Sequence, residues 1–185
     1  MRKVNITFGF AAAVCAMFWL DGKACLWFLL SLAVHEAGHL LAMKCSGVPV
    51  SEVRLKASGA VITGGFSGYR QEIACAAAGP FASFLLAFLL FRPAPEPAIV
   101  SGLLGIVNLL PVYPLDGGRI LRAALLLHLE QIVAEKVLRC VTGAVCCLLM
   151  VGACWAAAEL QAGLWPVFAA LVILWRVGQA GWQER

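Results

Sequence analysis

Six apolar stretches dominate the chain and decide what it can fold into. Each is close to the roughly 20 residues that a helix needs to cross the hydrocarbon core of a bilayer, although the fourth and sixth are short. Only 13% of the 185 residues are charged, while 62% are hydrophobic, and a soluble domain has about one-quarter charged residues. The sequence therefore predicts an all-α polytopic membrane protein with about six transmembrane helices, at residues 4–20, 24–45, 71–91, 98–115, 137–158 and 162–178.

The distribution of basic residues predicts how these helices are oriented. Cytoplasmic loops of membrane proteins carry an excess of Lys and Arg. If the N-terminus is cytoplasmic, only Lys23 and Arg92 of the 14 basic residues fall on the outer side. We therefore expect a multi-pass protein of the cell membrane with both termini cytoplasmic. The first apolar stretch is interpreted as a retained helix, because no small-residue cleavage site precedes Asp21.

The connections between the spans are brief, and no charged or Pro-rich linker divides the chain. We therefore expect a single integral-membrane domain over residues 1–185. The eight cysteines form no C-x-x-C pair and are interpreted as small apolar residues rather than disulfides or metal ligands. Basic and aromatic residues form no pattern that is typical of nucleic-acid binding, so the lipid bilayer is the expected surrounding.

The connector at residues 48–66, between the second and third spans, has the pattern of a small β-hairpin. Apolar and charged residues alternate over 52–57, Ser58-Gly59 supplies a turn, and a second short run follows at 60–63. Bare strand edges cannot face lipid, so we expect the hairpin at the interface or against protein. Two roles remain open for it: a simple connection, or an edge strand offered to an extended substrate.

The second span contains the sequence HEAGH at residues 35–39. A helix places His35 and His39 on one face, from which two nitrogens reach one zinc ion at about 2.0–2.1 Å. Glu36 is rotated away from that face and suits a base that takes a proton from water, which is why H-E-x-x-H is typical of zinc hydrolases. Ionised groups in a bilayer cost about 2.5–3.5 kcal/mol each. A metal would compensate for that cost, and the alternative is a proton relay or a buried polar cluster without metal.

Catalytic zinc usually has three protein ligands, and the predicted topology limits the candidates for the third. Asp116 ends the segment NLLPVYPLD at the cytoplasmic end of the fourth span, at a depth comparable with that of the two histidines. The residues alone leave two roles for it, a metal ligand or the N-cap of the next helix. That helix is predicted to be amphipathic and interfacial over residues 119–130, and we assign His128 to it rather than to the metal.

Taken together, these motifs resemble those of the site-2 proteases, a family of zinc metalloproteases that cut within membranes. HEAGH lies in one span, NLLPVYPLDGG lies in a later one at 108–118, and the Gly-Pro segment AAAGPFAS lies between them at 76–83. The resemblance covers residues 24–122, which would form the core that carries the motifs. We interpret Gly79-Pro80 as a packing element, because small residues let helices approach closely.

The resemblance implies a role for each matching residue. His35, His39 and Asp116 would bind Zn²⁺, and Glu36 would be the catalytic base. Asn108 would stabilise the oxyanion through its amide N–H, although a hydrogen bond between helices is an alternative role. The chain would be a zinc metalloendopeptidase that cleaves membrane-embedded or membrane-associated protein substrates.

The six-span layout, with HExxH in the second span, is most similar to the compact sporulation-type branch, which processes a membrane-associated pro-sigma factor. A pro-sigma factor or another regulatory precursor is therefore an expected substrate, and an inhibitory membrane partner or a homo-oligomer is compatible with this branch. Only QAGWQER remains after the sixth span, so we expect no CBS or PDZ domain. The alternative is a metal-binding membrane protein without proteolysis, either a permease or a pseudo-protease, against which the intact Glu36 argues.

Overall fold

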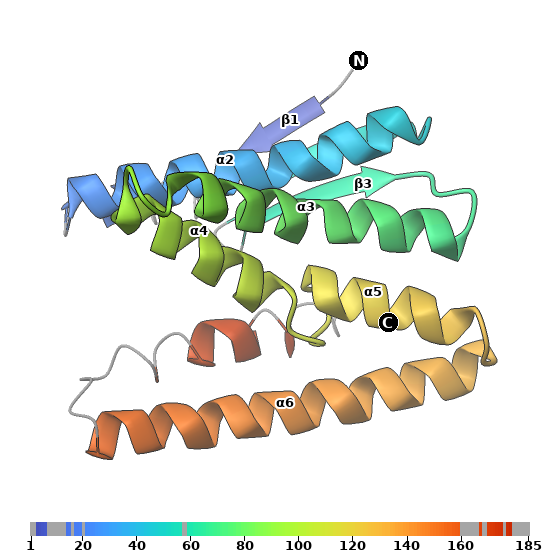
Figure 1. Ribbon diagram of the computed structural model, residues 1–185. Helices are drawn as coiled ribbons and strands as arrows, with labels where there is room; N and C mark the ends of the chain where they lie inside the picture. Colours follow the sequence, from blue (N-terminus) through green and yellow to red (C-terminus); the bar gives the residue numbers. More distant parts are fainter. Residues whose placement is uncertain are drawn as a thin grey trace. The chain divides into compact units, whose positions relative to one another are not determined.

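The computed structural model of the chain describes residues 3–6, 14–15, 17–19, 21–56, 59–159, 167, 170–175 and 177–178 (Figure 1). The chain divides into two compact units, Met1–Leu109 and Leu110–Arg185, which are described in turn. Three described helices are long and apolar enough to cross a membrane: α2 (Gly22–Cys45), α3 (Tyr69–Leu90) and α6 (Gln131–Glu159). They overlap the predicted second, third and fifth spans, although α6 begins six residues before the predicted start at 137.

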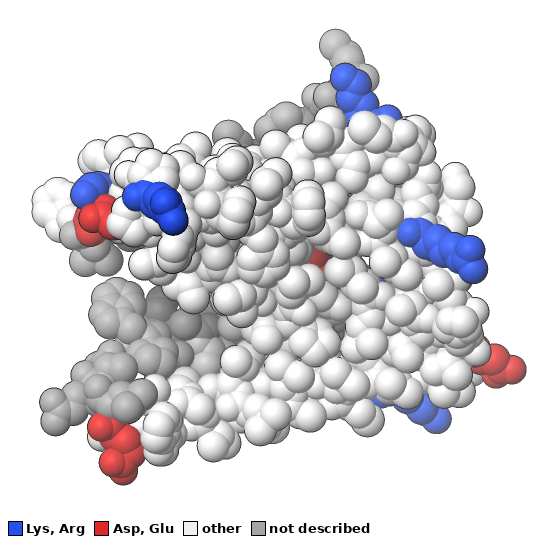
Figure 2. All heavy atoms as spheres, viewed as in Figure 1, with Lys and Arg blue, Asp and Glu red and all other residues white. Residues whose placement is uncertain are grey.

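The surface is apolar in the way that a membrane protein requires. Figure 2 shows a visible face that is mostly free of charged side chains. Large apolar side chains are exposed on the long helices, for example Leu41, Phe81 and Phe88. All eight cysteines are free thiols; three are buried and five are exposed, because the helices that carry them turn much of their surface outward.

The first unit contains α2, α3 and α4 (Pro95–Asn108). Asp21 is the N-cap of α2. Its carboxylate accepts hydrogen bonds from the backbone N–H groups of Lys23 and Ala24 and so satisfies two N-terminal donors of the helix. The helix ends before Gly47, which has a φ of 67°, a conformation that glycine adopts without strain. The helix boundaries therefore follow from ordinary capping chemistry.

Small residues bring α2 and α3 close together. A Cβ added at Gly38 of α2 would lie 2.6 Å from the carbonyl oxygen of Ala78 and 2.8 Å from the Cβ of Ala82, both on α3. Any larger residue at 38 would force the helices apart, since real Cβ atoms are essentially never found at such distances. Glycine at an interface between membrane helices allows this close approach. The histidines of α2 are thereby held directly against α3.

The N-terminal ends of α2 and α4 are joined by polar contacts. The Lys23 ammonium lies 2.8 Å from Glu96 Oε2, and the Trp27 indole N–H donates to the same oxygen at 3.3 Å. Lys23 and Glu96 are both exposed, so the pair contributes little to stability. It does fix which ends of the two helices lie side by side.

The chain between α2 and α3 forms two strands of a three-stranded sheet, whose strand order is β1-β2-β3. β2 (Val50–Lys56) and β3 (Gly59–Gly64) are antiparallel neighbours, with Val53 opposite Ile62. β1 (Lys3–Ile6) pairs in parallel with the other edge of β2. The Gln71 side chain connects the residues on either side of β2 and β3, since it accepts a hydrogen bond from the Ser67 N–H and donates one to the Ser46 carbonyl.

The strand β1 corrects the predicted start of the first span at residue 4. Val4 and Ile6 are β-branched residues that favour a strand, and the edge of β2 supplies their backbone partners. Of the remaining predicted span, the described residues 14–15 and 17–19 are helical. The other residues of that prediction lie outside the described part of the chain.

The second unit contains α5 (Asp116–Leu126) and α6. The predicted fourth span at 98–115 is wrong at its C-terminal end: α4 stops at Asn108, and residues 109–115 are not helical. Pro111 and Pro114 explain the break, because proline has no N–H to donate to the preceding turn. Likewise, the predicted helix over 119–130 begins at 116 and ends at 126.

The core of the second unit forms around the proline-containing segment. Val112, Leu115 and Cys146 are buried together. The partly buried apolar residues that pack against them are Leu110, Val145, Ile173, Leu174 and Val177. The Tyr113 N–H also donates to the Thr142 hydroxyl of α6 at 3.4 Å, and Arg122 of α5 donates to Glu135 of α6 at 2.8 Å. Of the predicted sixth span, the described residues 167, 170–175 and 177–178 are helical.

Candidate metal centre

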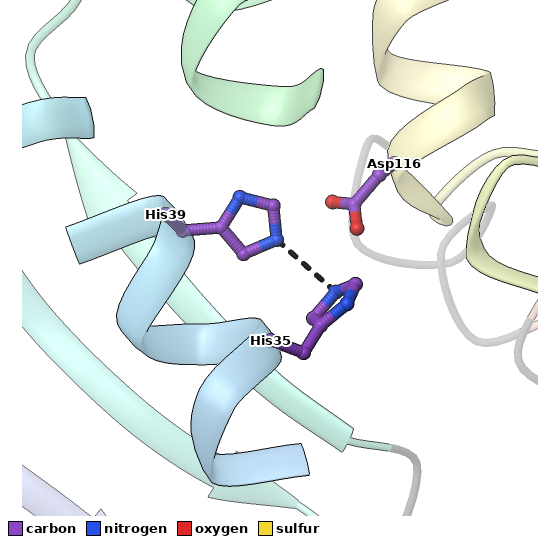
Figure 3. Close-up of side chains that lie close together, drawn as sticks. All are labelled: His35, His39 and Asp116. Atoms are coloured by element: carbon purple, nitrogen blue, oxygen red, sulfur yellow. Dashed lines mark hydrogen bonds between the residues drawn. The ribbon is translucent and has the colours of Figure 1, made fainter. Parts of the chain in front are cut away.

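His35 and His39 form a buried pair on one face of α2 (Figure 3). Their Nε2 atoms lie 3.2 Å apart, and their rings meet edge to face with centroids 4.9 Å apart. Two imidazole nitrogens bound to one tetrahedral zinc ion at about 2.0–2.1 Å are separated by about 3.3–3.4 Å. The two Nε2 atoms are therefore spaced as two ligands of a single zinc ion would be.

The other ring nitrogen of each histidine is held by α3. His39 Nδ1 lies 2.8 Å from the backbone carbonyl oxygen of Cys75, and His35 Nδ1 lies 2.9 Å from the Ser83 hydroxyl. A carbonyl can only accept, so His39 Nδ1 carries the proton and its Nε2 lone pair is available to a metal. Metal-ligating histidines almost always have such a second contact, which fixes the ring and its tautomer.

A glycine of α3 leaves the space that the His39 ring occupies. A Cβ added at Gly79 would meet three ring atoms of His39, all closer than 3.0 Å. Cys75, Gly79 and Ser83 are spaced by four residues and so lie on one face of α3. This face supports both histidines. The sequence interpretation of Gly79-Pro80 as packing missed that Gly79 packs against a site residue, and it assigned no role to Ser83.

Glu36 and Asn108, the two residues predicted to take part in catalysis, lie in the first unit together with the two histidines. Glu36 is half-buried and follows His35 directly on α2. Asn108 is the last residue of α4, and its side-chain amide donates to the Leu104 carbonyl of its own helix at 2.9 Å. Among the described residues, this side-chain hydrogen bond of Asn108 is therefore local to α4.

Asp116 lies in the second unit, at the start of α5. It is buried, and its Oδ1 lies 3.7 Å from Nη1 of Arg119 one turn later. Leu115 occupies the N-cap position, so the N-cap role that the sequence left open for Asp116 is not observed. A carboxylate in the first helical turn is stabilised by the helix dipole. Gly118 is required nearby, because a Cβ there would collide with the backbone of Val112 and Tyr113.

The donor set suits zinc. His35, His39 and Asp116 are all buried, and each offers one ligand atom. Two imidazoles and one carboxylate form a known ligand set of catalytic zinc, which leaves a further position for water or substrate. The spacing and outer hydrogen bonds of the two histidines fit the metal as well.

Comparison with protein families identifies the class of this chain. The family model described as Peptidase M50B-like matches residues 8–115, which is more than half of the chain. A second model, Peptidase family M50, matches residues 97–152. The chain belongs to peptidase family M50. This confirms the resemblance that HEAGH and NLLPVYPLDGG indicated.

Individual relatives agree with the family. The chain is 31% identical over 125 residues to zinc metalloprotease MJ0392 of Methanocaldococcus jannaschii, which covers 60% of this chain and 36% of that protein. It is 28% identical over 166 residues to stage IV sporulation protein FB of Bacillus subtilis, covering 82% of this chain and 57% of that protein. The alignments thus span between about a third and just over half of these relatives' lengths.

The fold has a counterpart among solved structures. The site-2 protease from Methanocaldococcus jannaschii superposes with a TM-score of 0.72 at 19% sequence identity, covering 96% of this chain and 90% of that one. The chain therefore has the fold of a site-2 protease.

Proposed function

We propose that this chain is a zinc-dependent intramembrane endopeptidase that cleaves membrane-embedded or membrane-associated proteins. The observation that carries the proposal is the buried histidine pair, whose Nε2 atoms are 3.2 Å apart while both Nδ1 atoms are held by α3. Membership of peptidase family M50 supports the reaction class. The relative named zinc metalloprotease MJ0392 supports the metal.

Asp116 is the proposed third ligand beside His35 and His39. It is buried, it begins α5, and it follows the proline-containing segment that the site-2 protease resemblance singles out. When bound, zinc activates water and polarises the peptide carbonyl. Arg119 Nη1 lies 3.7 Å from the Asp116 carboxylate, one helical turn along α5.

Glu36 and Asn108 are the proposed catalytic side chains. Glu36 takes the proton of the attacking water and then gives a proton to the leaving amine, which is the usual double role of a general base. Its position next to His35 keeps it near the metal, while the rotation along the helix keeps it off the ligand face. An asparagine amide has two N–H donors. One donates to Leu104, and the other is proposed to stabilise the oxyanion.

The substrate must be extended before it can be cut, because a helical carbonyl is engaged in its own hydrogen bonds. The sheet offers a place to hold such a segment. β2 already has β1 on one side and β3 on the other, so the outer edge of β3 is the hairpin's available edge among the described strands. We propose that an unwound substrate strand adds to this edge through backbone hydrogen bonds.

The proposed setting is the cell membrane, with about six spans, cytoplasmic N- and C-termini, and the chain acting as one catalytic domain. The contact between Lys23 and Glu96 supports this topology, since both residues are predicted to lie on the outer side. The similarity to stage IV sporulation protein FB favours a pro-sigma factor or another regulatory precursor as substrate. An inhibitory membrane partner or a second copy of the chain would fit the same setting.

The proposal is tested with the full chain reconstituted in liposomes. The substrate probe is a reporter whose single membrane span contains helix-breaking residues. We expect the parent to cleave the reporter and Glu36→Gln to bind zinc without cleaving. Glu72→Gln is the matched control, because it removes another half-buried carboxylate on a neighbouring helix, and it should cleave like the parent. Undiminished cleavage by Glu36→Gln would refute the proposed mechanism.

A further inference from the structure

We propose that Ser83 is a positioning residue for the metal centre: its hydroxyl lets the His35 ring adopt the tautomer that turns the Nε2 lone pair to the metal. The proposal rests on the proposed zinc site and adds to it a residue of α3. It concerns which nitrogen of the His35 ring carries the proton, and it adds no further metal ligand.

The contacts of Ser83 hold its hydroxyl in place. Oγ lies 2.9 Å from His35 Nδ1, and neither side chain is accessible enough for water to replace the contact. The backbone carbonyl of Ser83 accepts a hydrogen bond from the Ser101 hydroxyl of α4 at 2.9 Å, and Ser101 is fully buried too. Ser83 is therefore fixed between α2 and α4 in a place that solvent does not reach.

The two histidines differ in the group that their Nδ1 atoms face. His39 faces the Cys75 carbonyl, which only accepts, so its tautomer is the same with and without metal. His35 faces a hydroxyl, which can donate or accept. Only the His35 ring can therefore change tautomer without breaking its outer hydrogen bond.

The 3.2 Å separation of the two Nε2 atoms makes this freedom useful. Without a cation, two lone pairs at this distance repel each other, so His35 carries its proton on Nε2 and donates it to His39 Nε2. The Ser83 O–H then donates to His35 Nδ1. With a cation, both Nε2 lone pairs must face it, so His35 carries its proton on Nδ1 and donates to Ser83 Oγ. The hydroxyl hydrogen then turns to a carbonyl of the preceding helical turn, as serines in helices commonly do.

A second serine provides a matched control. Ser31 lies one turn before His35 on the same buried face of α2 and is fully buried. Its hydroxyl is the buried side-chain group that has no hydrogen-bond partner among the described residues. Ser31→Ala and Ser83→Ala thus each remove a fully buried serine hydroxyl, and only the second removes a contact with a histidine.

The test measures the zinc affinity of the purified full chain by competition with a chelator, together with its thermal stability. Ser83→Ala should bind zinc about 10–100-fold more weakly than the parent, the usual effect of losing such an outer contact. Ser31→Ala should match the parent, and Ser83→Thr, which keeps the hydroxyl, should recover affinity.

Parent-like zinc affinity in Ser83→Ala would overturn the inference, and so would an equal loss in Ser31→Ala, which would indicate a general packing effect. If the added methyl group prevents Ser83→Thr from folding, the comparison of Ser83→Ala with Ser31→Ala still tests the inference. A parent chain that binds no zinc would contradict the proposed function itself, and the two failures are thereby distinguished.

Discussion

Replacing Gly79 by alanine should remove the metal site while leaving the fold in place. The new Cβ would lie closer than 3.0 Å to three atoms of the His39 ring. Two responses are available to the molecule. Either the ring stays and the helices are pushed apart, or the ring rotates away and loses its hydrogen bond to the Cys75 carbonyl.

The magnitudes favour rotation of the ring. Overpacking in a core costs about 1–3 kcal/mol, whereas a hydrogen bond between membrane helices contributes about 0.6 kcal/mol on average. Alanine is preferred over glycine inside a helix by about 0.5–1 kcal/mol, which offsets the lost hydrogen bond. We therefore expect Gly79→Ala to have nearly the stability of the parent with His39 displaced. Loss of an outer contact usually lowers metal affinity by about 10–100-fold. The zinc affinity of Gly79→Ala should fall by more than this, because a ligand itself is displaced.

The assay compares thermal unfolding and zinc affinity of the same detergent-solubilised chains. Gly102→Ala is the matched control, because its Cβ would lie at an ordinary 3.7 Å from the Ala87 Cβ, and it should bind zinc like the parent. A Gly79→Ala chain that keeps the parent's zinc affinity would show that His39 is not a ligand, or that the close contact with Gly79 does not exist.

Two further substitutions test how the site is supported. Gly118→Ala should lower both stability and zinc affinity, because the Cβ collides with the backbone of the preceding turn and displaces the start of α5; an unchanged chain in the unfolding and zinc assays would contradict this packing. Ser101→Ala removes the hydrogen bond to the Ser83 carbonyl and should destabilise the chain by about 0.6 kcal/mol and no more than about 1.7 kcal/mol. The zinc affinity of Ser101→Ala should fall less than that of Ser83→Ala. An equal or larger fall would indicate that Ser101 of α4, rather than Ser83, is the main support of the His35 ring.

The features predicted well from sequence are those that neighbouring residues determine. The positions of His35 and His39 on one helical face follow from their spacing of four residues, and the ends of α2 and α3 lie within two residues of the predicted spans. Hydropathy and helical periodicity act over a few turns, so they are readable from one sequence.

Features that depend on distant partners were not predictable in the same way. The strand β1 depends on an edge supplied by β2, about fifty residues away in the chain. Pairing at such a distance leaves no periodic signal within one short segment.

The supporting role of α3 was also beyond the sequence. Ser83 was part of the Gly-Pro segment that the family resemblance marked, but its contact with His35 depends on how α2 and α3 are aligned. Close packing at Gly38 sets that alignment. The spacing of four between Cys75, Gly79 and Ser83 is the one signal that pointed to a shared face.

Zinc content per chain tests the central claim most directly. Elemental analysis of the purified parent, His39→Ala and Asp116→Ala requires no knowledge of the substrate. The account predicts stoichiometric zinc in the parent and loss of zinc in both variants, because each lacks one of three protein ligands. Equal zinc in the parent and Asp116→Ala would remove Asp116 from the site, and a parent without zinc would contradict the assignment of a metal centre to this chain.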